Sequence, residues 1–309
     1  MNKQGVISLG EAFVDYISID KSNTKYEKLL GGATVNVAAG TRRLGVPSYY
    51  LCKLGTDETS QFVEQELKKE NINIEFCVQT PNKKICGVYV HLNENGERYF
   101  HSYINPTPNE VLTENQLKRE LFERSKIFYF GSGTLFQESA KLTTRTAINC
   151  TKASNTLIAF DANIRLKRWE SEDQCRKTVL SFLPFADIIK LAEEELYFLT
   201  ETEKMDDGIK ILSQWKIPFV FITMGSKGAY AVFNETNIFV PGIEVKAVDT
   251  TGAGDAFMSA LLFRFHEKGN PQDLSQLTEY TQYANQIGAI ATTKRGSLSA
   301  FNINCFSQN

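Results

Sequence analysis

The sequence lacks the cysteine and histidine patterns that build metal sites, disulfide scaffolds or a histidine-based catalytic triad. Six cysteines are scattered over 309 residues with no C-x-x-C pair, and the three histidines lie far apart. Structural zinc sites and disulfide-rich secreted domains need closely spaced ligands or paired cysteines. Both classes are therefore excluded, and so is a hydrolase that depends on a Ser-His-Asp triad.

A long apolar run and a surplus of basic residues are also missing. No stretch of about 18 apolar residues occurs, so the sequence predicts no membrane helix. The net charge is −2, which argues against a surface for nucleic acid. The chain runs from Met1 through Gly5 straight into a short apolar strand pattern, without the long apolar segment of a signal peptide. We therefore expect a cytoplasmic protein that binds neither nucleic acid nor a membrane.

The order of the predicted elements indicates an α/β fold. The length allows one large domain or two, and 42% hydrophobic and 23% charged residues are ordinary for a globular protein. Strand and helix patterns alternate regularly in the second half of the chain. Strands are predicted at 127–130, 156–160, 187–191 and 219–223, with helices at 138–153, 193–199, 207–215 and 277–293. Such alternation predicts a parallel sheet covered by helices on both faces.

Two segments of the first half interrupt this alternation. Phe13–Ile19 is rich in strand-forming residues, with Asp15 among them. Ile85–Val90 and Glu97–Tyr103 alternate on either side of Asn95-Gly96. Asn-Gly between alternating runs is the strongest local signal for a hairpin. We expect these segments to form a small sheet apart from the main one.

A glycine turn near the C-terminus carries the clearest functional signal. The alternation of apolar residues over Ile243–Ala247 predicts a strand, and a helical pattern begins near Phe257. Between them lies Gly252-Ala253-Gly254-Asp255. Glycines at a helix N-terminus let backbone N–H groups converge on an anion, and a carboxylate in the first turn can accept a proton. A glycine turn with an aspartate cap is the alternative interpretation.

A second glycine turn opens a helix near the N-terminus. The pattern runs from Gly31 to Gly45, two residues before Pro47. Asn36 sits among small apolar residues, where an amide gains nothing from packing. Its amide could bond a sugar hydroxyl, or it could satisfy a neighbouring backbone carbonyl. Asp15 presents a similar choice between a functional carboxylate and a turn or cap residue.

Polar side chains follow several of the predicted strands. These groups are Asp161–Arg165, Lys190 with Glu193–Glu195, and Thr223–Gly228. Each group has a local explanation as a turn or a helix start, but ligands of open α/β sheets bind at the carboxyl ends of the strands. The chain has no G-x-x-x-x-G-K-S/T loop and no G-x-G-x-x-G fingerprint, so P-loop and dinucleotide-binding proteins are disfavoured.

These residues together resemble the ribokinase-like (PfkB) family of carbohydrate kinases. Gly31–Gly45 and Asp249–Asp255 are similar to its N-terminal and C-terminal signatures, and the resemblance covers essentially the whole chain. Asp161-x-Asn163-x-Arg165 and Trp169 are most similar to bacterial fructokinases, which usually have proline where this chain has Ala162. The resemblance implies a three-layer sandwich with a mostly parallel sheet and a small β lid. The lid would comprise residues 11–30 and 85–104, and the core residues 1–10, 31–84 and 105–309.

The resemblance also implies a reaction and the residues that perform it. The chain would be an ATP-dependent kinase that phosphorylates a sugar hydroxyl, converting D-fructose to fructose 6-phosphate. Other acceptors (2-keto-3-deoxygluconate, ribose, a sugar phosphate or a nucleoside) and a non-catalytic sugar-binding regulator are the alternatives. The resemblance implies that Asp255 is the base and that the amides of Gly252, Ala253 and Gly254 form the anion hole. Asp15, Gly32 and Asn36 would bind the sugar, and Arg165 would bind the phosphates or the substrate. The nucleotide would be bound by Thr223, Gly225, Gly228 and Asn285.

Two metal sites and a dimer are implied in the same way. Glu195 matches the glutamate of the family's N-x-x-E motif, which binds Mg²⁺ through water, but Ala192 replaces the usual asparagine or serine. Asp249 and Thr251, with the loop around Gly296, match positions that bind a monovalent cation such as K⁺. Relatives often pair their lids, so a homodimer through the lid is also expected.

Overall fold

The central sheet confirms the predicted α/β class. The computed structural model describes residues 3–105, 110–294 and 296. The sheet contains β14 (Thr236–Pro241), β13 (Gly228–Phe233), β12 (Phe219–Thr223), β11 (Ile188–Ala192), β10 (Leu157–Asp161), β9 (Ile127–Gly131), β1 (Val6–Leu9) and β4 (Ser48–Leu51), in that order. Neighbouring strands pair in parallel, except that β13 is antiparallel to both β12 and β14. The predicted mostly parallel sheet is therefore confirmed.

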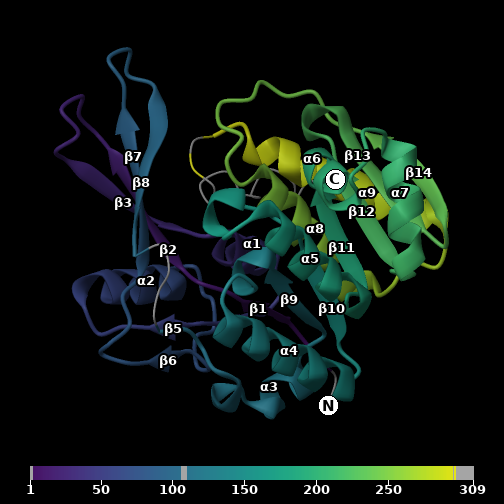
Figure 1. The fold of residues 1–309 in the computed structure, drawn as a ribbon, viewed down its shortest axis with the longest axis horizontal. Coiled ribbons are helices and arrows are strands. Elements are labelled where there is room, and N and C mark those ends of the chain that lie inside the picture. Colours follow the sequence, from purple (N-terminus) through teal and green to yellow (C-terminus); the bar gives the residue numbers. More distant parts are fainter. Residues whose placement is uncertain (1–2, 106–109, 295, 297–309) are drawn as a thin grey trace.

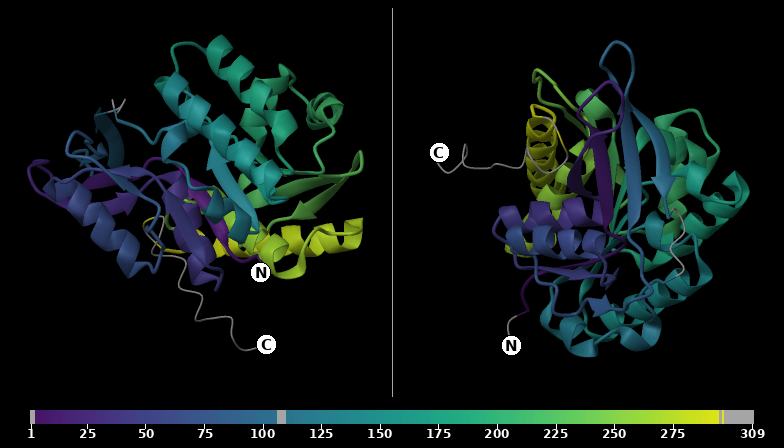
Figure 2. Two further views of the ribbon diagram at one scale, coloured as in Figure 1. Left: turned by 90° about the horizontal axis from the view of Figure 1, so that it is seen from below. Right: turned by 90° about the vertical axis from the view of Figure 1, so that its left-hand side faces the viewer.

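Helices cover both faces of this sheet and make the three layers (Figures 1 and 2). One face packs against α1 (Ala33–Arg43), α8 (Ala253–Lys268) and α9 (Leu274–Ala291). The other packs against α3 (Arg119–Arg124), α4 (Glu138–Ala153), α5 (Glu172–Phe182), α6 (Glu193–Thr200) and α7 (Met205–Leu212). Short 3-10 turns lie at Glu114–Gln116, Ser132–Thr134, Leu166–Arg168, Leu183–Phe185, Ser213–Trp215 and Gly225–Lys227.

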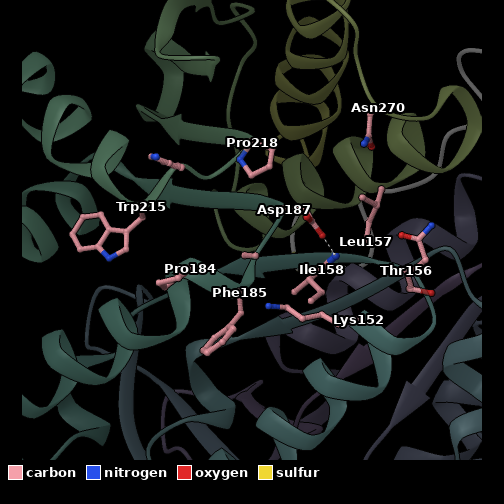
Figure 3. A pocket seen from close by; sticks show the side chains of 13 residues that line it. Lys152, Thr156, Leu157, Ile158, Pro184, Phe185, Asp187, Trp215, Pro218 and Asn270 are labelled. Carbon is pink, nitrogen blue, oxygen red and sulfur yellow. Dashed lines mark hydrogen bonds between the residues drawn. The ribbon is translucent and has the colours of Figure 1, made fainter.

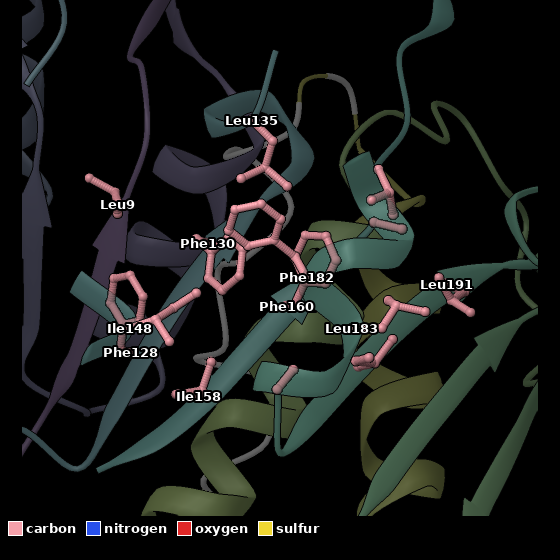
Figure 4. Close-up of a cluster of buried hydrophobic side chains, with 14 of the residues drawn as sticks. Leu9, Phe128, Phe130, Leu135, Ile148, Ile158, Phe160, Phe182, Leu183 and Leu191 are labelled. Atoms are coloured by element: carbon pink, nitrogen blue, oxygen red, sulfur yellow. The ribbon is translucent and has the colours of Figure 1, made fainter. Parts of the chain in front are cut away.

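The core explains why β9 shows no alternation of apolar and polar residues. All five residues of β9 are buried, with Phe128 and Phe130 facing one helical layer and Ile127 and Tyr129 the other. A strand covered on both faces has no solvated side, so the two-residue alternation disappears from its sequence. Phe130 stacks on Phe160 with ring centroids 4.7 Å apart (Figure 4).

The second sheet stands to one side of the sandwich (Figure 1). It contains β3 (Tyr26–Gly31), β2 (Phe13–Ser18), β7 (Cys86–Leu92) and β8 (Arg98–Ile104), in that order. The predicted hairpin is confirmed: β7 and β8 are antiparallel, and Asn93 N–H donates to the Glu97 carbonyl at 2.9 Å across the turn. Apart from Gly31, these strands lie inside residues 11–30 and 85–104, the segments predicted to form the lid.

In the segment between β4 and β7 the chain forms a helix and a two-stranded sheet. The chain leaves the central sheet after β4, and Cys52 separates β4 from β5 (Lys53–Leu54). β5 pairs in parallel with β6 (Val78–Gln79), and α2 (Glu58–Lys69) connects the two. Val63 and Leu67 of α2 are buried.

The strand predicted over Ile243–Ala247 is wrong. The chain leaves the sheet at Pro241, the end of β14, and no strand is assigned between this residue and α8. Ile243 is 44% exposed, Ala247 is exposed and Val245 is only half-buried, so the alternating apolar residues have no buried face to cover. Period-two alternation shows that a segment is extended, but only a neighbouring strand makes it part of a sheet.

Candidate active site

The first turn of α8 forms at the predicted glycine stretch. Gly252 has φ +80° and lies at the N-terminal boundary of the helix. The N–H of Ala256 bonds back to the Gly252 carbonyl at 2.8 Å, so the amides of Gly254 and Asp255 precede the intrahelical ladder and keep their donor capacity. The Ala253 amide instead closes a turn onto the Thr250 carbonyl at 3.2 Å. Within the described residues the amides of Gly252, Gly254 and Asp255 make no hydrogen bond, so they provide the open donors at this helix end.

The carboxylate of Asp255 is buried and held by two amides from distant segments. Asn36 Nδ2 donates to its Oδ2 at 2.7 Å, and Asn163 Nδ2 lies 3.4 Å from its Oδ1. Burial raises the pKa of Asp255, while the Asn36 hydrogen bond and the charges of Lys190 and Arg165 act against that rise. A carboxylate with a raised pKa is a stronger proton acceptor than an exposed one.

An ion pair lies beside this carboxylate at the carboxyl ends of β10 and β11. Lys190 Nζ lies 3.1 Å and 3.2 Å from the two oxygens of Asp161, and both side chains are buried. The two residues face each other in the β10–β11 register, as Ala192 and Thr223 do between β11 and β12. The polar residues that follow successive strands in sequence thus meet along one edge of the sheet, as parallel pairing predicts.

Glu195 ties the loop after β10 to the start of α6. One oxygen accepts the Ile164 N–H at 2.6 Å and the other accepts the Ala192 N–H at 2.8 Å. Arg165 follows Ile164 in this loop; it is exposed and donates to the Ile164 carbonyl at 3.0 Å. Its charge acts on Asp161 and Asp255 without a direct contact to either.

Asp15 lies on β2, in the small sheet. Among the residues that the structure describes, its carboxylate makes no hydrogen bond or ion pair, and burial raises its pKa to about 6. A Cβ on Gly31 would lie 2.5 Å from Asp15 Oδ2, so a larger residue there would displace this carboxylate. Gly32 has φ +108° and approaches the Glu11 carbonyl, which explains the second glycine by backbone geometry.

The four residues predicted to bind the nucleotide lie around the β12–β13 turn and on α9. Thr223 Oγ1 lies 3.3 Å from the Leu191 carbonyl, and Gly225 has φ +57°. Gly228 has φ +123°, and a Cβ there would lie 2.2 Å from the Val240 carbonyl. Asn285 Nδ2 donates to the carbonyls of Val240 and Pro241 at 3.0 Å and 3.1 Å. These contacts give Gly228 and Asn285 structural roles, and nucleotide binding stays a prediction.

Asp249 joins the loop before α8 to the segment after α9. Its Oδ1 accepts the Thr251 N–H at 2.9 Å and its Oδ2 accepts the Gly296 N–H at 3.0 Å. These backbone donors lower the pKa of Asp249 despite partial burial. Arg295 and the residues after Gly296, which belong to the loop predicted to bind a cation, lie outside the described residues. Within the described ranges no group of three or more His, Cys, Asp or Glu side chains could hold a metal ion.

Comparison with known proteins identifies the family to which this arrangement belongs. The model of the pfkB family of carbohydrate kinases matches residues 3–303. The chain belongs to the PfkB carbohydrate kinase family. Fructokinase-2 of Oryza sativa subsp. japonica is 35% identical over 310 residues, covering 96% of this chain and 90% of that protein. A fructokinase of Vibrio alginolyticus is 32% identical and covers 94% of each chain.

Solved structures of PfkB kinases superpose over almost the whole chain. The fructokinase of Vibrio cholerae O395, in a form with fructose, ADP and calcium ion bound, has a TM-score of 0.85 at 30% identity and covers 96% of both chains. The aminoimidazole riboside kinase of Salmonella enterica, complexed with aminoimidazole riboside and an ATP analogue, has a TM-score of 0.83 at 25% identity and also covers 96% of both. The predicted ribokinase-like fold is therefore confirmed.

Two side chains in this PfkB kinase site belong to polar groups that the sequence singled out, but the sequence predicted no individual role for them. Asn163 contacts Asp255, and Lys190 pairs with Asp161 beneath the glycine turn. The signals were present, because Asn163 belongs to the D-x-N-x-R pattern and Lys190 interrupts an otherwise apolar strand. The side chains that they contact could not be predicted, because the pattern of a strand does not show which helix packs on it.

A hollow of about 610 Å³ lies away from these residues (Figure 3). It is lined by Leu157, Asp187 and Pro218, which stand at or just before the amino ends of β10, β11 and β12. Ligands of parallel sheets bind at the opposite, carboxyl ends. This hollow is therefore not the candidate active site. Along the described part of the chain, no helix has both the length and the apolar character needed to cross a bilayer.

Proposed function

We propose that this PfkB kinase transfers the γ-phosphoryl group of ATP to D-fructose, forming fructose 6-phosphate. The observation that carries the proposal is the buried Asp255 carboxylate at the open first turn of α8, held by Asn36 and Asn163. Fructose as the acceptor is supported by the fructokinases that are 35% and 32% identical to this chain.

In this proposal each group at the turn has one task. Asp255 takes the proton from the attacking sugar hydroxyl onto a carboxylate oxygen, while Asn36 and Asn163 keep the carboxylate oriented. The amides at the start of α8 stabilise the negative charge that grows on the phosphoryl oxygens. The Asp15 carboxylate, without a protein partner among the described residues, accepts hydrogen bonds from sugar hydroxyls as the small sheet closes over them.

The oxygen ligands that this site offers are compatible with Mg²⁺, provided that the nucleotide phosphates supply most of its coordination. Each oxygen of Glu195 accepts one backbone N–H, which leaves a lone pair for a metal-bound water. Mg²⁺ keeps several waters and binds through one or two carboxylates plus substrate phosphates, so a dedicated cluster is not required. Bound there, Mg²⁺ would neutralise phosphate charge. Asp249 and Thr251 are our proposed site for a monovalent cation, and Thr223, Gly225, Gly228 and Asn285 line our proposed nucleotide site.

An acceptor panel tests the proposal. ADP release is measured with Mg²⁺ for fructose, ribose, 2-keto-3-deoxygluconate and nucleosides, with and without K⁺. Fructose is expected to give the highest kcat/KM. A nucleoside is a necessary arm, because the aminoimidazole riboside kinase is also a structural relative. A different preferred acceptor would change the substrate but keep the kinase, whereas no ADP release with any acceptor would favour a sugar-binding regulator.

We also propose that two copies pair through the small sheet and that the protein is cytoplasmic. Tyr99 on the edge strand β8 is 45% exposed, which leaves apolar surface for a partner sheet. The described cysteines are free thiols, as expected in a reducing compartment. Light scattering on the purified protein tests the dimer, and Tyr99→Glu is expected to yield monomers.

A further inference from the structure

Lys190 is a buried lysine in the middle of an apolar strand. It is 5% exposed, and the Asp161 carboxylate that it contacts is fully buried. Burying an ammonium costs free energy unless it is paired, and even a buried ion pair adds little to the net stability of the fold. A well-packed apolar residue would suit β11 better if stability were the only requirement, so the position invites a functional explanation.

The ammonium lies directly against the first turn of α8. A Cβ placed on Gly254 would lie 3.0 Å from Lys190 Nζ, so glycine at this position leaves room for the charge. The N-terminus of a helix carries a partial positive charge and repels a cation. The ammonium is therefore favourable at this helix end only if anions lie next to it. Asp161, Glu195 and Asp255 supply them, and all three act electrostatically on Lys190.

The donors of Lys190 are not all used. An ammonium has three N–H groups. Its hydrogen bonds within the described residues both go to the oxygens of Asp161, so one donor is left on the side of the Gly254 turn. A bound phosphoryl oxygen can accept from it without any rearrangement of Asp161.

The polar and charged groups that face Asp255 come from several elements. The neutral ones are Asn36 of α1, Tyr129 of β9 and Asn163 of the loop after β10. The charged ones are Asp161 of β10, Arg165 of the following loop, Lys190 of β11 and, through Lys190, Glu195 of α6. Lys190 and Arg165 are the cations among them. Arg165 is exposed and therefore screened by solvent and salt, whereas a buried charge is screened much less. Lys190 is thus the dominant fixed positive charge at the carboxylate.

We propose that Lys190 is a positioning residue for the phosphoryl transfer: anchored by Asp161, its ammonium supplies the fixed positive charge against which the Asp255 carboxylate and the incoming phosphoryl group are held. The inference rests on the proposed function, in which Asp255 is the base. It assigns Asp161 the task of holding the lysine rather than contacting substrate.

The test compares Lys190→Met, Lys190→Arg and Asp161→Asn with the wild type by the pH dependence of kcat. Lys190→Met is expected to lower kcat by about 10²-fold, similar to the loss of one oxyanion-hole donor, with the fructose KM within about threefold. The acid limb of its kcat–pH profile moves to higher pH, because Asp255 loses a nearby cation. Lys190→Arg recovers part of kcat and brings the acid limb back to its wild-type position. Asp161→Asn moves the limb to lower pH, because it removes an anion and keeps the ammonium.

The matched control is Lys83→Met, which removes another buried lysine. Lys83 is fully buried and pairs with Glu11 at the base of the small sheet, without a contact to Asp255. Its loss should lower thermal stability while the acid limb stays in place. A folded Lys190→Met with wild-type kcat and limb would overturn the proposal, as would a double variant Lys190→Met/Asp161→Asn with wild-type kcat.

Two further arms keep the inference testable by other means. If Lys190→Met does not fold, Asp161→Asn decides, and an unchanged or raised acid limb contradicts the proposal. If the wild type phosphorylates none of the acceptors, the proposed function has failed, but ¹³C carboxyl NMR still reports the titration of Asp255. An unchanged titration in Lys190→Met would then overturn the role of Lys190 by itself.

Discussion

Asn36 Nδ2 donates to Oδ2 of Asp255 at 2.7 Å, joining residues that are 219 positions apart in the chain. Asn36 lies in α1 and Asp255 in the first turn of α8, and the two helices pack against each other on one face of the sheet. The asparagine implied by family resemblance to bind sugar therefore contacts the base itself. Because this contact orients a reacting group, it leads directly to testable differences between kcat and KM.

Asp255→Asn is expected to lower kcat by about 10²–10⁴-fold, the usual contribution of a general base. The amide is nearly isosteric but cannot take the hydroxyl proton. Isothermal titration with ATP should show nucleotide affinity close to that of the wild type. Unchanged turnover would remove Asp255 from its role as base.

Asn36→Ala is expected to act mainly on kcat, with a smaller change in the fructose KM. Loss of the amide removes a hydrogen bond that lowers the pKa of Asp255, so the acid limb of kcat should move to higher pH. Steady-state kinetics from pH 5 to 9 would show this. A large rise in the fructose KM with an unchanged kcat would instead place Asn36 on the sugar alone.

Asp15→Ala is expected to raise the KM for fructose far more than the KM for ATP. The carboxylate lies on the small sheet and has no protein partner among the described residues, so sugar hydroxyls are its natural donors. Initial rates with each substrate varied in turn separate the two effects. Equal rises in both KM values would contradict a specific contact with the sugar.

Asp15→Asn is expected to stabilise the protein above pH 6 and to change its Tm little at pH 4. Burial raises the pKa of Asp15 from 3.8 to about 6, so the folded state holds a proton that the unfolded state has lost between these values. Stability therefore falls as pH rises through this window and stays reduced above it. Thermal melts at pH 4, 6 and 8 test the sign. A variant less stable than the wild type at pH 8 would show that the carboxylate is compensated in the fold.

Local patterns predicted most of the elements, because they depend on residues close together in sequence. The helix predicted at 138–153 is α4, and Asn95-Gly96 marks the β7–β8 hairpin. The same reasoning failed over Ile243–Ala247, where the segment has no neighbouring strand. It also left β13, β14 and α5 undescribed. The boundaries of the lid and the roles of the site residues stay predictions.

The sequence by itself determined the family, the α/β class and the glycine turn that ends in Asp255, since each depends on short patterns with their own backbone physics. Only the tertiary structure decided that Asn36 and Asn163 hold that carboxylate and that Lys190 lies against Gly254. The reason is physical: a side chain's partner depends on how helices pack across the sheet, and that packing unites segments that no local pattern connects. The reaction could thus be predicted from a motif, while the charges that support its base required the fold.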